Sequence, residues 1–321
     1  MNYLLLFIGL VLLVKGADYM IDGAIELAMI FGLSSLFMGL SVTALGTSAP
    51  EAAVSVKAAI SSYSSISFGN VLGSNIANIG LVLGLGALVW TIKARESTIK
   101  REMPFCLAVV VVLFLMLFDD WFGNEQAFLS RFDGIILLIF LFVYIYYLYS
   151  MAKKDRRSFL LNSDLPRIDY SGRKIFKACV LLIFGTAGVL FGANLIVDNA
   201  VIIAKSLGVS EILISVTIIA LGTSLPEMVT SLAAMRKGES DIAIGNVVGS
   251  NIFNILFVLG LSSTIRPISF PPMAFLDLWF VLGFSVVLIV FAYTKRTISK
   301  KEGGMLLLFY MFYIAFVIIR K

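Results

Sequence analysis

Histidine is absent from this chain of 321 residues, and cysteine occurs only twice, as Cys106 and Cys179. The two cysteines lie in or beside apolar segments far apart in the sequence, so they predict neither a disulfide framework nor a metal site. The sequence also lacks a nucleotide-binding glycine loop. Paired carboxylates are then the only groups left for catalysis, and such a mechanism normally uses Asp. We therefore expect no enzyme and no cofactor.

Charge is scarce as well. Charged residues make up 14% of the chain and hydrophobic residues 60%, with a mean hydropathy of +0.99. Soluble domains carry about 25% charged residues, so this composition predicts a chain surrounded by membrane lipid. The net charge of +5 comes from short basic tracts between apolar runs, such as residues 153–157, which are typical of orientation signals. We expect neither a nucleic acid nor an obligatory protein partner.

Apolar runs long enough to cross a bilayer recur along the whole chain and predict an all-α, polytopic membrane protein with ten transmembrane helices. The spans are expected at residues 3–30, 36–60, 65–91, 103–119, 131–150, 175–204, 212–235, 241–263, 274–293 and 304–320. Only residues 151–174 form a long polar connection, which we interpret as a cytoplasmic linker. It divides one membrane domain into a first five-helix repeat, 1–150, and a second, 175–321.

Basic residues predict the orientation of the chain. The loops on the side of the linker hold eighteen Lys and Arg, at 93–101, 153–177, 236–237 and 295–301, whereas the opposite side has few. By the positive-inside rule, both termini lie outside the cytoplasm of a multi-pass plasma-membrane protein.

Two motifs occur twice, at one constant offset of 176 residues. Ala44–Glu51 recurs as Ala220–Glu227 with one residue changed, and Gly69–Asn78 recurs as Gly245–Asn254. Since each half has an odd number of spans, the two repeats are expected to be inverted in the membrane. Inverted repeats with interrupted helices are typical of secondary transporters, which bind their substrate near the membrane midplane.

The first motif is rich in oxygen ligands. Proline at 50 and at 226 blocks the helical hydrogen bond to the carbonyls of Gly46 and Gly222, and these glycines add flexibility. We therefore expect the carbonyls of Ala44 and Ala220 to be released from helical bonding. Within a membrane such backbone is tolerated only in a polar cavity or buried in protein. Carbonyl, hydroxyl and carboxylate oxygens are the ligands that hard cations such as Ca²⁺ and Na⁺ prefer.

Glu51 and Glu227 are acids within apolar spans, where a charge costs about 2.5–3.5 kcal/mol or more. Two carboxylates brought together by the repeat would repel each other unless a divalent ion or protons lay between them, which favours a cation site. The alternative for each is a hydrogen-bonded buried carboxyl, or one at a water interface.

Neutral oxygens complete the candidate site. Its hydroxyls have an alternative interpretation as packing groups bonded to the preceding helical turn. The serines and asparagines of the second motif recur at a spacing of four and so share one helix face. The candidate residues are Ala44, Thr47, Ser48, Glu51, Ser74, Asn78, Ala220, Thr223, Ser224, Glu227, Ser250 and Asn254.

At these motifs the sequence resembles the cation/Ca²⁺ exchanger superfamily, and specifically its Na⁺/Ca²⁺ exchanger branch with two alpha repeats. The resemblance implies an antiporter that exchanges Ca²⁺ for Na⁺ by alternating access. It also implies that Glu51 and Glu227 bind Ca²⁺ directly and that the neutral oxygens complete the Ca²⁺ and Na⁺ sites. Potassium-dependent relatives carry Asp at the position of Asn254, so the amide argues against K⁺ dependence. The spans starting at Tyr3 and Ile175 resemble the sliding gate helices of the family.

Two alternatives stay open. H⁺/Ca²⁺ exchangers share the fold and the paired acids, and hydroxyls do not exclude protons from a buried carboxylate. A passive cation channel of another class would use the same oxygens, but would conduct Ca²⁺ without a counter-gradient.

Overall fold

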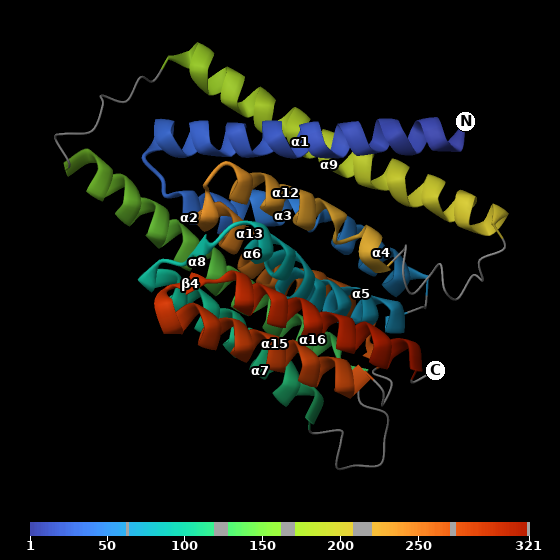
Figure 1. Cartoon of the computed structure of the whole chain (residues 1–321). Helices are drawn as coiled ribbons and strands as arrows, with labels where there is room; N and C mark the ends of the chain where they lie inside the picture. The colour runs from blue at the N-terminus through green and yellow to red at the C-terminus, as the bar shows by residue number, and fades with distance from the viewer. Residues whose placement is uncertain (62–63, 119–127, 162–170, 208–219, 270–273, 320–321) are drawn as a thin grey trace. The chain divides into compact units, whose positions relative to one another are not determined.

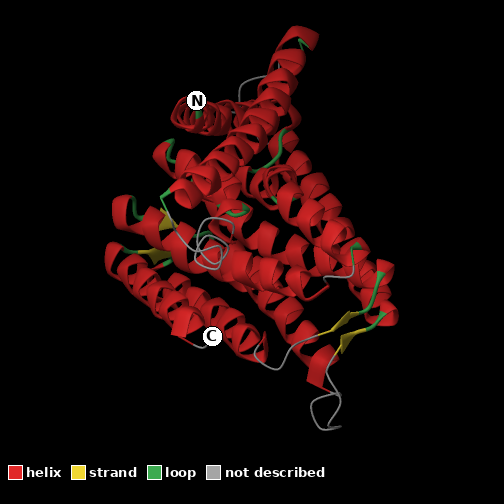
Figure 2. Cartoon of the chain, turned by 90° about the vertical axis from the view of Figure 1, so that its right-hand side faces the viewer, coloured by secondary structure: helices red, strands yellow, loops and turns green. Residues whose placement is uncertain are grey.

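The chain is almost entirely helical in the computed structural model (Figure 2). The structure describes residues 1–61, 64–118, 128–161, 171–207, 220–269 and 274–319. It divides into two compact units, of which unit 1 comprises Met1–Thr47 and Ile145–Val247, and unit 2 comprises Ser48–Tyr144 and Val248–Lys321. Each unit thus combines segments from both halves of the sequence repeat.

Unit 1 is built around two long helices that lie side by side, α1 and α9 (Figure 1). Its helices are α1 (Asn2–Phe31), α2 (Ser35–Met38), the π-helical η1 (Gly39–Thr43), α3 (Ala44–Thr47), α9 (Gly172–Ser206), α11 (Ala220–Gly222) and α12 (Leu225–Arg236). Two further helices, α8 (Arg131–Leu161) and α13 (Ser240–Phe253), each contain a unit boundary.

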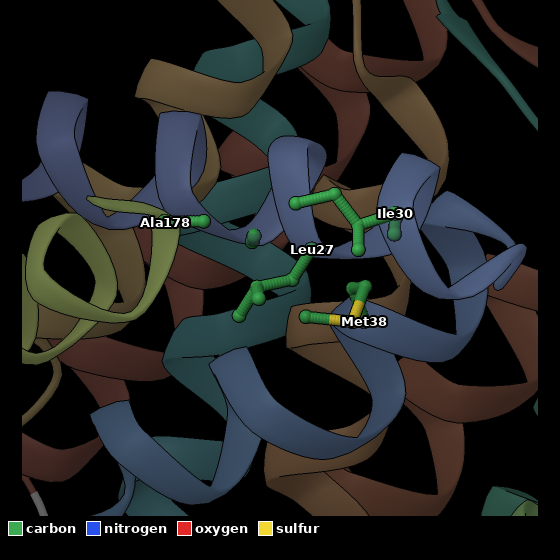
Figure 3. Packing of buried hydrophobic residues seen from close by; sticks show 6 residues of the cluster. Leu27, Ile30, Met38 and Ala178 are labelled. Carbon is green, nitrogen blue, oxygen red and sulfur yellow. The ribbon is translucent and has the colours of Figure 1, made fainter. Parts of the chain in front are cut away.

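Glycines allow α1 and α9 to approach closely. A Cβ atom added at Gly16 would lie 2.6 Å from the Val189 nitrogen, and one at Gly23 would lie 2.6 Å from the Leu182 nitrogen. Near the end of α1, Leu27 and Ile30 pack in one apolar cluster with side chains of α2 and α9 (Figure 3). This close packing buries one face of each helix and is typical of small residues between membrane helices.

Three side-chain contacts within unit 1 join connections or helix ends to other helices. The Ser34 hydroxyl, at the start of α2, donates to Asp155 Oδ2 of α8 over 2.6 Å. At the end of α12, Arg236 pairs with Asp18 of α1, and Lys237 lies 2.5 Å from Asp22 of the same helix.

Among the described residues, unit 2 contains the remaining helices and four short strands. In chain order they are α4 (Ala49–Ile60), α5 (Ser64–Ala77), η2 (Asn78–Leu83), α6 (Gly84–Val89), β1 (Ile92–Lys93), η3 (Thr98–Glu102), α7 (Met103–Phe118), β2 (Phe128–Leu129), η5 (Asn254–Leu259), α14 (Gly260–Ile265), β3 (Ile268–Ser269), α15 (Ala274–Lys295), β4 (Thr297–Ile298) and α16 (Lys300–Ile319). The strands form two antiparallel pairs, β1 with β4 and β2 with β3.

Among the described residues, seven helices are long and apolar enough to cross a membrane. They are Asn2–Phe31, Ile66–Val89, Arg131–Leu161, Gly172–Ser206, Ser240–Ile265, Phe275–Lys295 and Lys300–Ile319. The other three predicted spans correspond to shorter pieces. Residues 36–60 are broken into several helices, α7 has 16 residues, and residues 212–219 of the span 212–235 lie outside the described residues. The membrane character predicted from composition is therefore confirmed, whereas the count of ten stays a prediction.

The predicted linker is helical at both of its edges. Helix α8 continues to Leu161 and α9 begins at Gly172, so parts of 151–174 extend the neighbouring helices. Lys and Arg are good helix formers, which explains why a basic tract does not end α8.

Candidate cation-binding site

Each acidic motif lies at an interruption between two helices. Ser48, with φ −80° and ψ 6°, separates α3 from α4, and Ser224, with φ −85° and ψ 0°, separates α11 from α12. A proline lies in the first turn of the second helix, as does the glutamate, Glu51 in α4 and Glu227 in α12. The interruption predicted from proline is confirmed. A carboxylate in a first helical turn is stabilised by the positive end of the helix dipole.

Glu51 is fully buried in unit 2 and is held by the neighbouring helix α5. Its Oε1 accepts a hydrogen bond from the Ser74 hydroxyl over 3.2 Å, which brings two predicted site residues together. Its backbone carbonyl accepts from Asn70 Nδ2 over 3.2 Å, and the same amide donates to Ser55 Oγ over 3.0 Å. Helix α5 therefore fixes both the side chain and the backbone of the glutamate.

Glu227 is fully buried in unit 1, and its backbone carbonyl accepts a hydrogen bond from an asparagine, as that of Glu51 does. Asn246 Nδ2 donates to the Glu227 carbonyl over 3.4 Å and to Ser231 Oγ over 2.9 Å. Asn246 Oδ1 accepts from the Thr47 hydroxyl over 3.2 Å, and this hydroxyl also lies 3.3 Å from the Ala44 carbonyl. The Thr47 hydroxyl therefore contacts both its preceding turn and the side chain of Asn246, and its role as an ion ligand stays a prediction.

Four asparagines form a hydrogen-bonded cluster in unit 2. Asn78 Nδ2 donates to Asn251 Oδ1, and Asn254 Nδ2 donates to Asn75 Oδ1, each over 3.0 Å. Asn75 and Asn251 also donate to each other's backbone carbonyls, over 3.2 and 3.3 Å. Asn78 and Asn254 are the first residues of the π-helical segments η2 and η5. Such segments are frequent at functional sites, because they change the direction of side chains within a helix.

The predicted ligands Asn78 and Asn254 each keep a side-chain oxygen without a hydrogen bond. Both residues are fully buried, and neither Oδ1 accepts a hydrogen bond within the described part of the chain. Buried polar atoms normally have a partner, so an exception of this kind requires an explanation. A cation that takes both amide oxygens as ligands would fit the chemistry of these atoms.

The other predicted site residues differ in burial. Ser48, Ser224 and Ser250 are buried, and Thr223 is partly buried. Ala220 is the first residue of α11. Glu51 and Glu227 belong to different units, so their joint action on one ion stays a prediction.

Sequence reasoning missed the asparagines that support these groups, namely Asn70, Asn75, Asn246 and Asn251. The signal was present, since both motif copies contain them at equal positions. Their role lies in contacts between helices, which spacing along one helix does not reveal.

The chain matches known proteins over nearly its whole length. The family described as "Sodium/calcium exchanger protein" matches residues 1–150 and 177–319. The chain is 36% identical over 311 residues to "Inner membrane protein YrbG" of Escherichia coli (strain K12), with 94% of this chain and 92% of that protein covered. It is 34% identical over 345 aligned positions to "Sodium/calcium exchanger MaX1" of Methanosarcina acetivorans, with 99% and 98% covered.

A solved structure is similar as well. The fold matches that of the sodium-calcium exchanger NCX_Mj, soaked with 10 mM Na⁺ and zero Ca²⁺, with a TM-score of 0.83, 32% identity and 98% of each chain covered. Together with the long apolar helices, these matches identify a multi-pass integral membrane protein. The chain belongs to the sodium/calcium exchanger protein family.

Proposed function

We propose that this chain is a secondary active antiporter that exchanges Ca²⁺ for Na⁺ across the plasma membrane by alternating access. The observation that carries the proposal is the buried Glu51 carboxylate at a helix interruption, hydrogen-bonded by Ser74, in a motif that recurs at Glu227. Burial of an acid within a membrane costs free energy, so two acids at matched positions indicate a function beyond packing.

In this proposal the two glutamates supply the two negative charges that one Ca²⁺ neutralises. Hydroxyl, amide and backbone oxygens of the other ten candidate residues complete the coordination of Ca²⁺ and Na⁺, which compete for overlapping positions. Neutralised carboxylates permit the switch between outward and inward access, because only then is the charge of the site compensated. The long glycine-packed pair α1 and α9 supplies the moving gate helices.

The proposal includes the arrangement of the chain in the membrane. Ten spans form two inverted five-helix repeats, 1–150 and 175–321, with the connection 151–174 in the cytoplasm and both termini outside. The constant offset of 176 residues between the motifs supports the duplication, and the distribution of Lys and Arg supports the orientation.

Calcium uptake into proteoliposomes tests the function. The purified chain is reconstituted in vesicles loaded with Na⁺, and ⁴⁵Ca²⁺ uptake is followed after dilution into Na⁺-free buffer. We expect uptake that requires the Na⁺ gradient and falls to background in Glu51→Gln and Glu227→Gln. Glu96→Gln is the matched control, because Glu96 is an exposed acid paired with Arg296 on the surface. Full uptake by both buried-acid variants would refute the site.

The same vesicles separate the alternatives. Uptake driven by a H⁺ gradient and indifferent to Na⁺ would identify a H⁺/Ca²⁺ exchanger. Uptake with no counter-gradient of Na⁺, H⁺ or K⁺ would identify a channel. Dependence on K⁺ is not expected, since the residue at 254 is a neutral amide.

A further inference from the structure

Asn75 and Asn251 connect the two motif copies through a crossed pair of hydrogen bonds. Each side-chain NH₂ donates to the backbone carbonyl of the other residue, over 3.2 Å from Asn75 and 3.3 Å from Asn251. Both residues are buried. Because an amide can rotate by half a turn and exchange its O and NH₂, these donor contacts fix which end of each amide faces which neighbour.

The fixed amides in turn orient two further amides. Asn75 Oδ1 can only accept, so it takes the NH₂ of Asn254, and Asn251 Oδ1 likewise takes the NH₂ of Asn78, each over 3.0 Å. Rotation of Asn78 or Asn254 by half a turn would oppose two carbonyl oxygens. The contact therefore leaves the side-chain oxygens of Asn78 and Asn254 as the groups that accept no hydrogen bond from any described residue.

We propose that Asn75 and Asn251 are positioning residues of the cation site, which hold the amides of Asn254 and Asn78 so that a cation meets an oxygen and not an NH₂ group. The proposal rests on the proposed function. Each contact joins the two repeats. Asn75 of the first repeat orients the Asn254 oxygen of the second, and Asn251 of the second repeat orients the Asn78 oxygen of the first. An NH₂ group turned toward the ion would remove a ligand and place partial positive charge beside a cation.

Double-mutant cycles on Ca²⁺ uptake by the full chain in proteoliposomes test whether Asn75 acts through Asn254 and Asn251 acts through Asn78. Asn75→Ala is expected to raise the KM for Ca²⁺ by about three- to tenfold, the effect of losing the hydrogen bond that orients Asn254. In an Asn254→Ala background it should have no further effect, because the amide that it orients is gone. In an Asn78→Ala background, the increases in KM from the two substitutions should multiply, since no side-chain hydrogen bond joins Asn75 and Asn78. Asn251→Ala should have no further effect in an Asn78→Ala background, and its effect should multiply with that of Asn254→Ala.

A purely structural role predicts a different result. Loss of packing at Asn75 would lower the amount of active protein and kcat, and its effect would multiply equally in the Asn78→Ala and Asn254→Ala backgrounds. That result would overturn the proposal. Asn70→Ala is the matched control on the same helix, because its side chain donates to the Glu51 carbonyl and to Ser55 Oγ, so its effect should multiply with that of Asn254→Ala.

Failure of the proposed function is distinguishable from failure of this inference. Wild-type uptake that lacks dependence on a counter-ion refutes exchange, and the same cycles are then measured as the Ca²⁺-induced rise in Tm of the detergent-solubilised protein. Wild-type exchange combined with equal effects of Asn75→Ala in both backgrounds refutes the positioning role alone. Should an alanine variant not fold, Asn75→Ser and Asn251→Ser take its place in the cycles.

Discussion

At the scale of single residues, the two copies of the motif use one solution to hold a buried acid. The glutamate lies in the first turn of a helix, where the helix dipole favours a negative charge, and its backbone carbonyl accepts from an asparagine of the next helix. The contact distances are 3.2 Å from Asn70 to Glu51 and 3.4 Å from Asn246 to Glu227. Because the same contact recurs in both copies, it is part of the motif and not a local accident of packing.

The Ser74 hydroxyl gives the first prediction. It donates to Glu51 Oε1 over 3.2 Å, and hydrogen bonds to charged groups contribute about 1.5–3 kcal/mol. We expect Ser74→Ala to raise the KM for Ca²⁺ in vesicle uptake by about tenfold or more. Ser285→Ala is the control, since this buried serine donates to the Val281 carbonyl of its own helix and should leave the KM unchanged. Equal KM values for both variants would show that Ser74 does not act on the acid.

The sequence predicted the acids and hydroxyls of the site but not their connections. Glu51 and Ser74 were found because carboxyl and hydroxyl groups within apolar runs are conspicuous. The bond between Asn75 and Asn251 joins residues 176 positions apart, and nothing in the periodicity of one helix specifies which helix lies opposite. Whether the oxygen or the NH₂ group of an amide is left without a hydrogen bond depends on that neighbour, so it required the structure.

At the scale of helices, proline predicted the interruptions and glycine explains the close approach of α1 and α9. The π-helical segments η2 and η5 were not predicted, because no residue type specifies a π turn as proline specifies a break. The packing of α1 on α9 depends on glycines. A methyl group at these positions would collide with backbone atoms of the other helix, which cannot shift without moving the helix itself.

Gly16 tests this packing. An added Cβ would lie 2.6 Å from the Val189 nitrogen and 2.8 Å from the Gly185 oxygen, and overpacking of this kind costs about 1–3 kcal/mol. We expect Gly16→Ala to lower the Tm of the detergent-solubilised protein and to slow Ca²⁺ uptake. Gly172→Ala, at the start of α9, is the matched control, because its Cβ would meet no described atom within 4 Å. A Tm for Gly16→Ala as high as that of Gly172→Ala would contradict close packing at this site.

The ion pairs between α1 and the end of α12 give a third prediction. Asp18 and Asp22 lie within the first predicted span, and in the structure they pair with Arg236 and Lys237. These side chains are partly exposed, so each pair contributes at most about 1 kcal/mol. Asp18→Asn should therefore lower Tm by no more than about 3 °C at low salt, and less at 1 M salt. In an Arg236→Gln background the same substitution should have no effect on Tm, and a large additive loss would show that Asp18 acts elsewhere.

At the scale of the whole chain, composition and the repeat predicted the class of protein but not its compact units. The division into halves follows the order of the sequence, whereas each unit combines residues from both halves. Each unit forms because segments of one half pack on segments of the other. These contacts between the halves cannot be predicted from the sequence of either half alone. The family and the membrane character needed only the motifs and the apolar runs.

Contacts within each unit agree with the predicted sides of the membrane. In unit 2, strand pairing joins the connections at 92–93 and 297–298, both predicted cytoplasmic, and those at 128–129 and 268–269, both predicted external. In unit 1, Ser34 after the first predicted span bonds Asp155 of the predicted linker. None of these three contacts joins connections assigned to opposite sides.

The orientation itself is the last prediction. Eighteen Lys and Arg in the connections on the linker side predict that this side is cytoplasmic, so the C-terminus should be external. In a Gram-negative host, alkaline phosphatase fused after Lys321 should be active, since it needs an oxidising compartment to form its disulfides, whereas green fluorescent protein fused there should be dark. Both reporters should give the opposite result when fused after Gly238, between α12 and α13. Fluorescence from the C-terminal fusion would show that the basic connections face outward and that the positive-inside rule fails for this chain.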